Sequence, residues 1–297
     1  MTCRQTLRYL PLSFFTLLLP GPTWAAEKVL RADKPFLPTG EVNDRAILGE
    51  LNKKTGQLRE SKATTRGEDL IKQLSRKTCK LKLSKPGNKK LSTAEIVKRY
   101  RKGVVVVSGY YKCKRCPNWH SSAASGFMLT KDGVFCTSYH VVENKDNDTL
   151  VIMTGDGRIA PVLEVLAANK RTDLAILRVA GKDYTPLPVA TEASPGEKVR
   201  VLSHPDKRFY TLSEGIISRR WLDQRPGRGA RSMLAITADF AKGSSGAPVF
   251  NEYGAVVGSV NNTQSTYYSV NKGVKDNLQM VFKNCVSMRH LLELIEQ

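Results

Sequence analysis

A serine between glycines in the C-terminal part of the chain is the residue best suited to nucleophilic chemistry. Ser245 lies within Gly243–Pro248, with Gly243 two positions before it and another glycine directly after it. A serine hydroxyl is a weak nucleophile at neutral pH and needs a base beside it. Histidine titrates closest to neutrality, and His140 is the one of four histidines that directly follows a strand-like apolar segment. We therefore predict that His140 takes the proton of Ser245.

A carboxylate must hold such an imidazole in the correct tautomer and stabilise its positive charge. Asp173 begins an apolar run that continues to Leu177, a setting suited to a buried carboxylate. Taken singly, each pattern is ordinary, since Gly-x-Ser-Gly is often only a turn and an aspartate before a strand is often a cap. The three together, in the order His140, Asp173, Ser245, predict a catalytic triad for acyl transfer. The N–H groups of Gly243 and Ser245 are the expected oxyanion hole, because glycine lets the backbone turn its N–H inward.

Two series of short, β-branched segments surround these residues, with a break at 181–195. The first series is 104–110, 125–129, 134–138, 150–153, 159–166 and 174–179; the second is 198–202, 215–218, 233–237, 248–250, 255–260 and 279–286. This pattern predicts an all-β fold of two tandem six-stranded antiparallel barrels, over about 103–180 and 185–286. His140 and Asp173 fall in the first barrel and Ser245 in the second, so the site is expected in the cleft between them.

The ends of the chain have a different character. Residues 1–25 resemble a signal peptide, with an apolar run from Leu10 to Leu19 that is too short to span a bilayer. The mature protein is therefore expected to be exported, to the periplasm or the medium. A capping box of Ser92 and Glu95 predicts a short helix to about Lys102. Residues 287–296 are apolar at helical spacing, which predicts a closing helix.

Positive charge gathers in residues 26–91, which we expect to form a basic, partly disordered extension with short helices near 44–51 and 67–74. The chain has a net charge of +20, and residues 27–102 hold 21 Lys/Arg against 9 Asp/Glu. Such an extension is either a solvated pro-segment or a weak contact for anionic polymers or a membrane surface. Few aromatic residues interleave the charge, which argues against specific nucleic-acid binding.

Residues from about 94 to 297 resemble the trypsin-like peptidase domain of the HtrA/Deg family, within the chymotrypsin-like serine peptidases. The motifs behind this resemblance are 124–127, 137–142, 172–175 and 243–246, and the terminal segment 280–295 is also similar. The resemblance implies a serine endopeptidase that cleaves misfolded or exposed polypeptides without a metal or organic cofactor. No PDZ domain is expected after residue 297, so the family's rules of assembly do not carry over and the oligomeric state stays open.

Substrate preference is less constrained by the sequence. Asp239 lies six residues before Ser245, the offset at which trypsin-like enzymes hold the carboxylate at the base of the primary pocket. If Asp239 points inward, substrates with Lys or Arg before the scissile bond are favoured; HtrA-like enzymes, in contrast, usually present apolar pockets. Asn261 and Thr263 are expected to flank the substrate backbone.

A cluster of potential sulfur and nitrogen ligands lies between the first two predicted strands. Cys113 and Cys116 could form a disulfide across a tight loop, or bind zinc together with His120. Export favours the disulfide, and no fourth zinc ligand is evident nearby. Five cysteines follow the predicted signal peptide, so at least one has no partner within the chain, and Cys136 is expected to be a buried apolar residue.

Two other functions remain compatible with the sequence. One is a protease-like module that binds peptides without turnover. The other is an anion-binding envelope protein that acts through its basic extension, in which case binding would weaken steeply with salt and survive loss of Ser245.

Overall fold

The computed structural model describes residues 28–33, 37, 40–225, 229–271 and 273–296. The predicted signal peptide, residues 1–25, lies outside these described residues. Within them, no helix is both long and apolar enough to cross a membrane.

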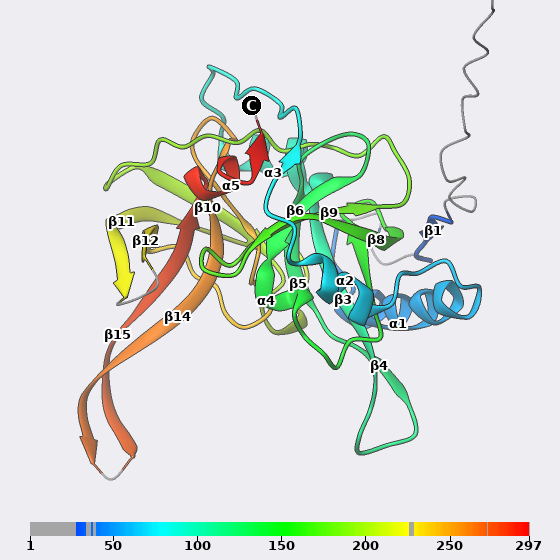
Figure 1. The fold of residues 1–297 in the computed structure, drawn as a ribbon. Coiled ribbons are helices and arrows are strands. Elements are labelled where there is room, and N and C mark those ends of the chain that lie inside the picture. The colour runs from blue at the N-terminus through cyan, green and yellow to red at the C-terminus, as the bar shows by residue number, and fades with distance from the viewer. Residues whose placement is uncertain (1–27, 34–36, 38–39, 226–228, 272, 297) are drawn as a thin grey trace, which may run out of the picture.

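Six antiparallel strands in the first half of the protein form a closed ring (Figure 1). They pair in the order β8-β7-β3-β5-β6-β9, and β8 also pairs with β9. Their bounds are β3 Val104–Lys112, β5 Ala124–Met128, β6 Val134–Ser138, β7 Thr149–Thr154, β8 Arg158–Asn169 and β9 Leu174–Val179. Successive strand residues point to opposite faces. Val105 and Val107 therefore belong to one apolar cluster and Val104 and Val106 to another, and all four are buried.

A second closed barrel follows, in the order β10-β11-β12-β15-β14-β13. Its strands are β10 Lys198–Ser203, β11 Thr211–Arg225, β12 Gly229–Ile236, β13 Pro248–Phe250, β14 Val256–Asn271 and β15 Val274–Ser287. Its interior includes Val199, Leu234, Val249 and Val257. β14 and β15 continue beyond the barrel as a long hairpin, which projects from the body of the molecule (Figure 1). All twelve predicted strands and the all-β fold class are thus confirmed.

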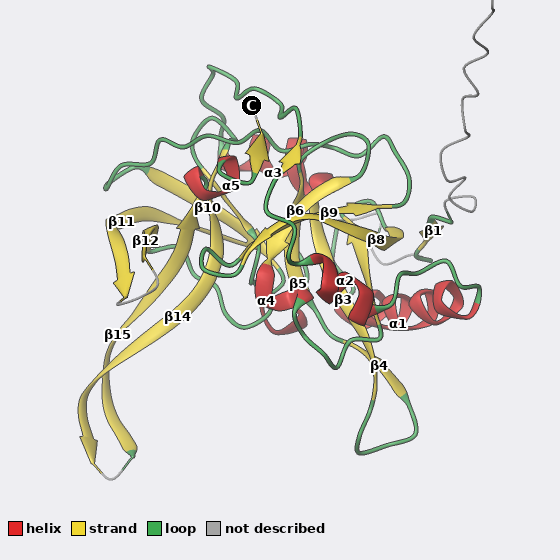
Figure 2. Cartoon of the chain, viewed as in Figure 1, coloured by secondary structure: helices red, strands yellow, loops and turns green. Residues whose placement is uncertain are grey.

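The extension is more ordered than predicted (Figure 2). The helix expected near 44–51 continues to Glu60 as α1 (Asp44–Glu60), and its residues Ile47, Leu51 and Leu58 are fully buried in the same apolar cluster as Val104. The second expected helix is α2 (Gly67–Gln73). Because α1 contributes to the core, the extension is part of the folded body.

Short elements complete the fold. The predicted capping box is present: Ser92 accepts a hydrogen bond from the Glu95 N–H at the start of α3, and the Glu95 carboxylate accepts one from the Ser92 N–H. The closing helix is shorter than predicted, because α5 ends at Leu292 and the chain then forms a strand that pairs in parallel with β2 of the extension. The remaining elements are β1 Leu30–Arg31, β2 Cys79–Lys80, α3 Thr93–Tyr100, η1 Arg101–Gly103, β4 Trp119–Ser121, α4 Tyr139–Val142, η2 Pro205–Lys207, α5 Arg289–Leu292 and β16 Ile295–Glu296.

Candidate active site

Strand pairing in the first barrel brings His140 and Asp173 together. β6 ends at Ser138, which lies opposite Leu174 at the start of β9. α4 begins directly after β6, so His140 stands beside the residue that precedes β9. The Asp173 carboxylate accepts hydrogen bonds from the backbone N–H of His140 at 3.0 Å and from its ring, with Nδ1 2.9 Å and 3.0 Å from the two carboxylate oxygens.

The surroundings of this pair suit an imidazole that must receive a proton. The Asp173 side chain is only 12% exposed, whereas that of His140 is 51% exposed. The hydrogen bond to Asp173 and its negative charge hold the pKa of His140 above its usual value, against the opposing effect of desolvation. The carboxylate therefore favours the protonated ring, which is the form that proton transfer from a nucleophile would create.

Three asparagines of the second barrel form a chain of hydrogen bonds that ends on Asp173. Asn284 Nδ2 donates to Asn262 Oδ1 at 3.0 Å, and Asn262 Nδ2 donates to Asn261 Oδ1 at 3.0 Å. Asn261 Nδ2 then donates to Asp173 Oδ2 at 2.6 Å. The pairing of β14 with β15 shifts register between Val260 and Asn262, so Asn261 is the extra residue of a β-bulge, a feature that redirects a side chain.

The backbone around Ser245 is fixed from the first barrel by one buried residue. The Ser125 N–H donates to the Ser245 carbonyl at 2.9 Å, and the Ser125 hydroxyl donates to the Gly243 carbonyl at 3.0 Å. Gly246 has a φ of +85°, and a Cβ added there would lie 2.4 Å from the Ser125 carbonyl and 2.9 Å from the backbone nitrogen of Ser138. Ser245 is therefore held against the part of the first barrel that leads into His140.

The same hydrogen bonds leave two N–H groups unused. Ser244 N donates to Ala241 O, Gly246 N to Val260 O and Ala247 N to Ser244 O. In this segment, all of which the structure describes, only the N–H groups of Gly243 and Ser245 have no acceptor. Gly243 has a φ of +98°, which glycine tolerates.

Within the described part of the chain, no hydrogen bond joins Ser245 Oγ to the His140 ring. Catalytic hydrogen bonds are often long in the absence of substrate and tighten when it binds. The structure thus brings the backbone of Ser245 to the barrel that bears His140 and Asp173.

The structure shows the surroundings of the residues that were expected to contact substrate. Asp239 does not point inward: its side chain is 84% exposed, and Oδ1 lies 2.6 Å from Lys283 Nζ. It lines an open pocket of about 520 Å³ that includes Phe282 but none of His140, Asp173 and Ser245. A preference for Lys or Arg before the scissile bond required Asp239 to point inward, and the structure does not show this orientation. Thr263 is exposed on β14, where it pairs with Lys283 of β15, and its contact with the substrate backbone stays a prediction.

The cysteine loop also differs from expectation. Cys113 and Cys116 are free thiols, so the disulfide favoured by export is absent from the structure. Cys116 Sγ lies 3.2 Å from His120 Nε2, and Cys113 Sγ accepts a hydrogen bond from the Arg115 N–H. Cys136 is fully buried, as predicted.

Comparisons with known proteins agree with this architecture. Residues 124–258 match the family described as "Trypsin-like peptidase domain". The chain is 30% identical over 147 residues to a probable periplasmic serine endoprotease, DegP-like, of Hahella chejuensis, a match that covers 49% of this chain and 30% of the relative. It is 35% identical over 141 residues to a protein of the same description from Rhizobium meliloti, covering 45% and 26% of the two chains. It is also 27% identical over 143 residues to the serine endoprotease DegS of Haemophilus influenzae, covering 46% and 41%.

A solved structure supports the fold. The HtrA-type protease AlgW with a tripeptide superimposes with a TM-score of 0.53 at 20% identity, covering 68% of this chain and 62% of that one. The chain spans less than half the length of each of the three curated relatives.

Two barrels with a histidine–aspartate pair in the first and a glycine-flanked serine in the second define a trypsin-like peptidase domain. Within that class, the chain is similar to the DegP-like and DegS serine endoproteases.

Proposed function

We propose that the protein is an exported serine endopeptidase that cleaves unfolded or exposed polypeptides through an acyl-enzyme. Ser245 is the nucleophile, His140 the base and Asp173 the residue that orients the base. The observation that carries this proposal is the bond between the His140 ring and a carboxylate of low exposure. Four hydrogen bonds reach that carboxylate from His140 and Asn261.

Catalysis follows from these positions. Ser245 Oγ attacks the carbonyl carbon of the scissile bond while His140 Nε2 takes its proton, and the Asp173 carboxylate stabilises the imidazolium. The negative charge that develops on the substrate oxygen is stabilised by the N–H groups of Gly243 and Ser245. Removal of one such donor typically costs about 3 kcal/mol of transition-state stabilisation. His140 then returns the proton to the leaving amine, and water releases the acyl group by the same steps.

Substrate class and location rest on the relatives. The relatives from Hahella and Rhizobium are named periplasmic endoproteases, and the AlgW structure is named as a complex with a tripeptide. Export is consistent with the apolar run from Leu10 to Leu19. Exposed polypeptide is therefore the substrate that we propose.

The test compares the wild-type protein with the Ser245→Ala variant on an unfolded protein, with fragments identified by mass spectrometry. Cleavage should fall by up to roughly 10⁶-fold, the loss observed when a catalytic serine is removed from a triad. Equal cleavage by both proteins would refute the proposed nucleophile. If both are inert while both bind unfolded polypeptide, the protein is a peptide-binding module without turnover.

A further inference from the structure

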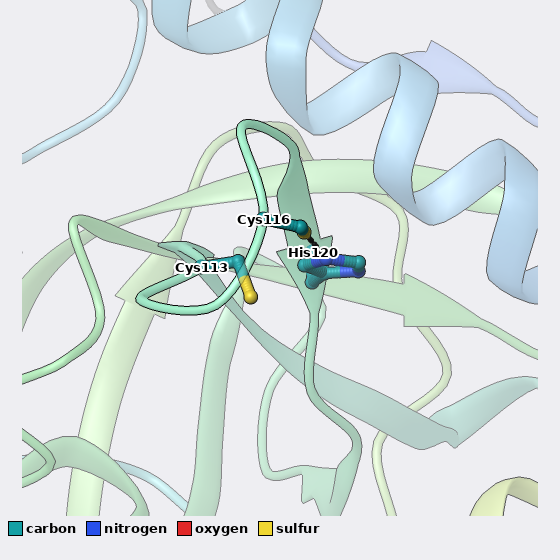
Figure 3. A group of neighbouring side chains, drawn as sticks. All are labelled: Cys113, Cys116 and His120. Carbon is teal, nitrogen blue, oxygen red and sulfur yellow. Dashed lines mark hydrogen bonds between the residues drawn. The ribbon is translucent and has the colours of Figure 1, made fainter.

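Two cysteines of the loop between β3 and β4 and a histidine of β4 form a cluster of three potential metal ligands. The potential ligand atoms of Cys113, Cys116 and His120, two thiol sulfurs and a ring nitrogen, all lie within 4.8 Å of one another (Figure 3). None of the three contributes to the proposed peptidase mechanism. All three are only half-buried, so an ion can reach them from solvent.

The hairpin geometry explains why these side chains converge. His120 on β4 lies directly opposite Tyr111 on β3. Cys113 is two residues beyond Tyr111 and therefore lies on the same face of the hairpin as His120. The Cys113 N–H donates to the Asn118 carbonyl at 3.0 Å, which closes the loop and holds Cys116 over that face.

The distances fit one tetrahedral ion. Zinc bonds thiolate sulfur at about 2.3 Å and imidazole nitrogen at about 2.0 Å, so two ligand atoms on one zinc stand about 3.6–3.8 Å apart. The separation of 3.2 Å between Cys116 Sγ and His120 Nε2 is close to this value, and 4.8 Å bounds the other two separations. A small rotation of the Cys113 side chain therefore completes the set.

Charge and hydrogen bonding also suit zinc. Two thiolates would offset both positive charges of the ion, which matters because Lys112, Lys114 and Arg115 lie next to the two cysteines in the sequence. The Arg115 N–H already donates to Cys113 Sγ at 3.3 Å, and such contacts outside the ligand set orient metal ligands. Soft sulfur with imidazole selects zinc over magnesium or calcium.

We propose that Cys113, Cys116 and His120 bind one zinc ion, with the fourth position taken by water. Binding forms two Zn–S bonds and one Zn–N bond and releases the thiol protons. The ion would order the loop that leads into Trp119, whose ring stacks on Tyr110 with centroids 5.0 Å apart. The guanidinium of Arg59, on α1, lies 4.3 Å from the Trp119 ring centroid, so the site supports the contact between the extension and the first barrel.

The experiment uses the full chain, purified with reductant, freed of metal and then given Zn²⁺. Bound zinc per chain is measured by atomic emission, and Co²⁺ is used as a second probe because sulfur ligation produces charge-transfer absorption. We expect one zinc per chain, a higher Tm with zinc, and protection of two thiols from alkylation. The double variant Cys113→Ser, Cys116→Ser should lose zinc binding and the rise in Tm, and His120→Asn should weaken zinc binding, and the protection of the two thiols, by at least about tenfold.

Cys79→Ser is the matched control, because Cys79 is half-buried on β2 and lies outside the cluster. This variant should bind zinc like the wild type. If the reduced wild-type chain binds no zinc, or if the double variant binds as much, the proposal is wrong. The same holds if Cys113 and Cys116 oxidise to a disulfide in the presence of excess zinc. Alkylation of the wild type tests the site even if a variant fails to fold.

Discussion

Replacement of Asn261 by alanine tests whether the second barrel tunes the carboxylate of the first. Asn261 Nδ2 donates to Asp173 Oδ2 at 2.6 Å, and Asn261 Oδ1 accepts a hydrogen bond from Asn262. A hydrogen bond to a charged group contributes about 1.5–3 kcal/mol. If that contribution serves the transition state, its loss lowers the rate roughly ten- to 150-fold, because each 1.36 kcal/mol is a factor of ten.

The pH dependence gives a second, independent result. Without Asn261 the negative charge of Asp173 is less compensated, so Asp173 stabilises protonated His140 more strongly. The pKa of His140, already above its usual value because of Asp173, should rise further. Since only neutral His140 can accept a proton, the acidic limb of activity should move to higher pH in Asn261→Ala.

The assay is the rate at which a fluorophosphonate labels Ser245, measured across pH, because this reaction needs an activated serine but no knowledge of the preferred peptide. Asn284→Ala removes the far end of the asparagine chain, where a neutral hydrogen bond contributes about 1 kcal/mol, so labelling should fall by about fivefold. Thr266→Ala, on the exposed part of β14, is the control and should label like the wild type. An unchanged rate and an unmoved acidic limb in Asn261→Ala would refute this account of the site.

Three further predictions follow from the same geometry. The acidic limb of wild-type activity should lie above pH 6.5 in a pH–rate profile, because Asp173 raises the pKa of His140; a limb below pH 6 would contradict the pairing of the two residues. Protonation of His140 in the folded protein also adds a small stability, which is present at low pH and is lost as pH rises through the raised pKa. Gly246→Ala should abolish labelling and lower Tm, because the added Cβ lies 2.4 Å from the Ser125 carbonyl oxygen. Gly196→Ala is the control: Gly196 has a φ of +90° with nothing within 4 Å of an added Cβ, so this variant should lose only the stability that backbone strain costs, about 1–3 kcal/mol. Asp239→Asn should not change which residues precede the cleaved bonds in fragment maps, since Asp239 is exposed and paired with Lys283. A loss of cleavage after Lys and Arg would instead show that Asp239 acts in the primary pocket.

The barrels were predictable because their strands are apolar runs between turn residues. The segments Val104–Lys112 and Val134–Ser138, for example, lie close to their predicted bounds. β14 and β15 extend well past the predicted ends, since their outer parts are exposed and carry no apolar period. Pattern reasoning detects burial, and it misses a strand that is stabilised only by its partner.

The extension was harder to interpret for a related reason. Apolar residues are sparse in it, so composition indicates weak order. Yet Ile47, Leu51 and Leu58 repeat at helical spacing and fill a surface that the first barrel leaves open. Deletion of residues 26–91 would therefore remove part of the core, so anion binding by the extension is better tested by replacing exposed lysines such as Lys82 and Lys85.

The candidate site also combines residues that a local motif makes predictable with residues whose role depends on contacts distant in sequence. His140, Asp173 and Ser245 stand in recognisable local motifs, but what positions them is set by residues far away in sequence. Ser125 has an unremarkable side chain, and only the closed ring places it where its N–H and hydroxyl reach the carbonyls of Ser245 and Gly243. Asn261 was predicted beside the substrate, and that role stays a prediction; its hydrogen bond to Asp173, which a one-residue bulge makes possible, was not predicted. All three hydrogen bonds cross between the barrels, so small movements of one barrel against the other would disturb Ser245 and Asp173 together. Variants that loosen this interface should therefore lose activity before they lose the fold.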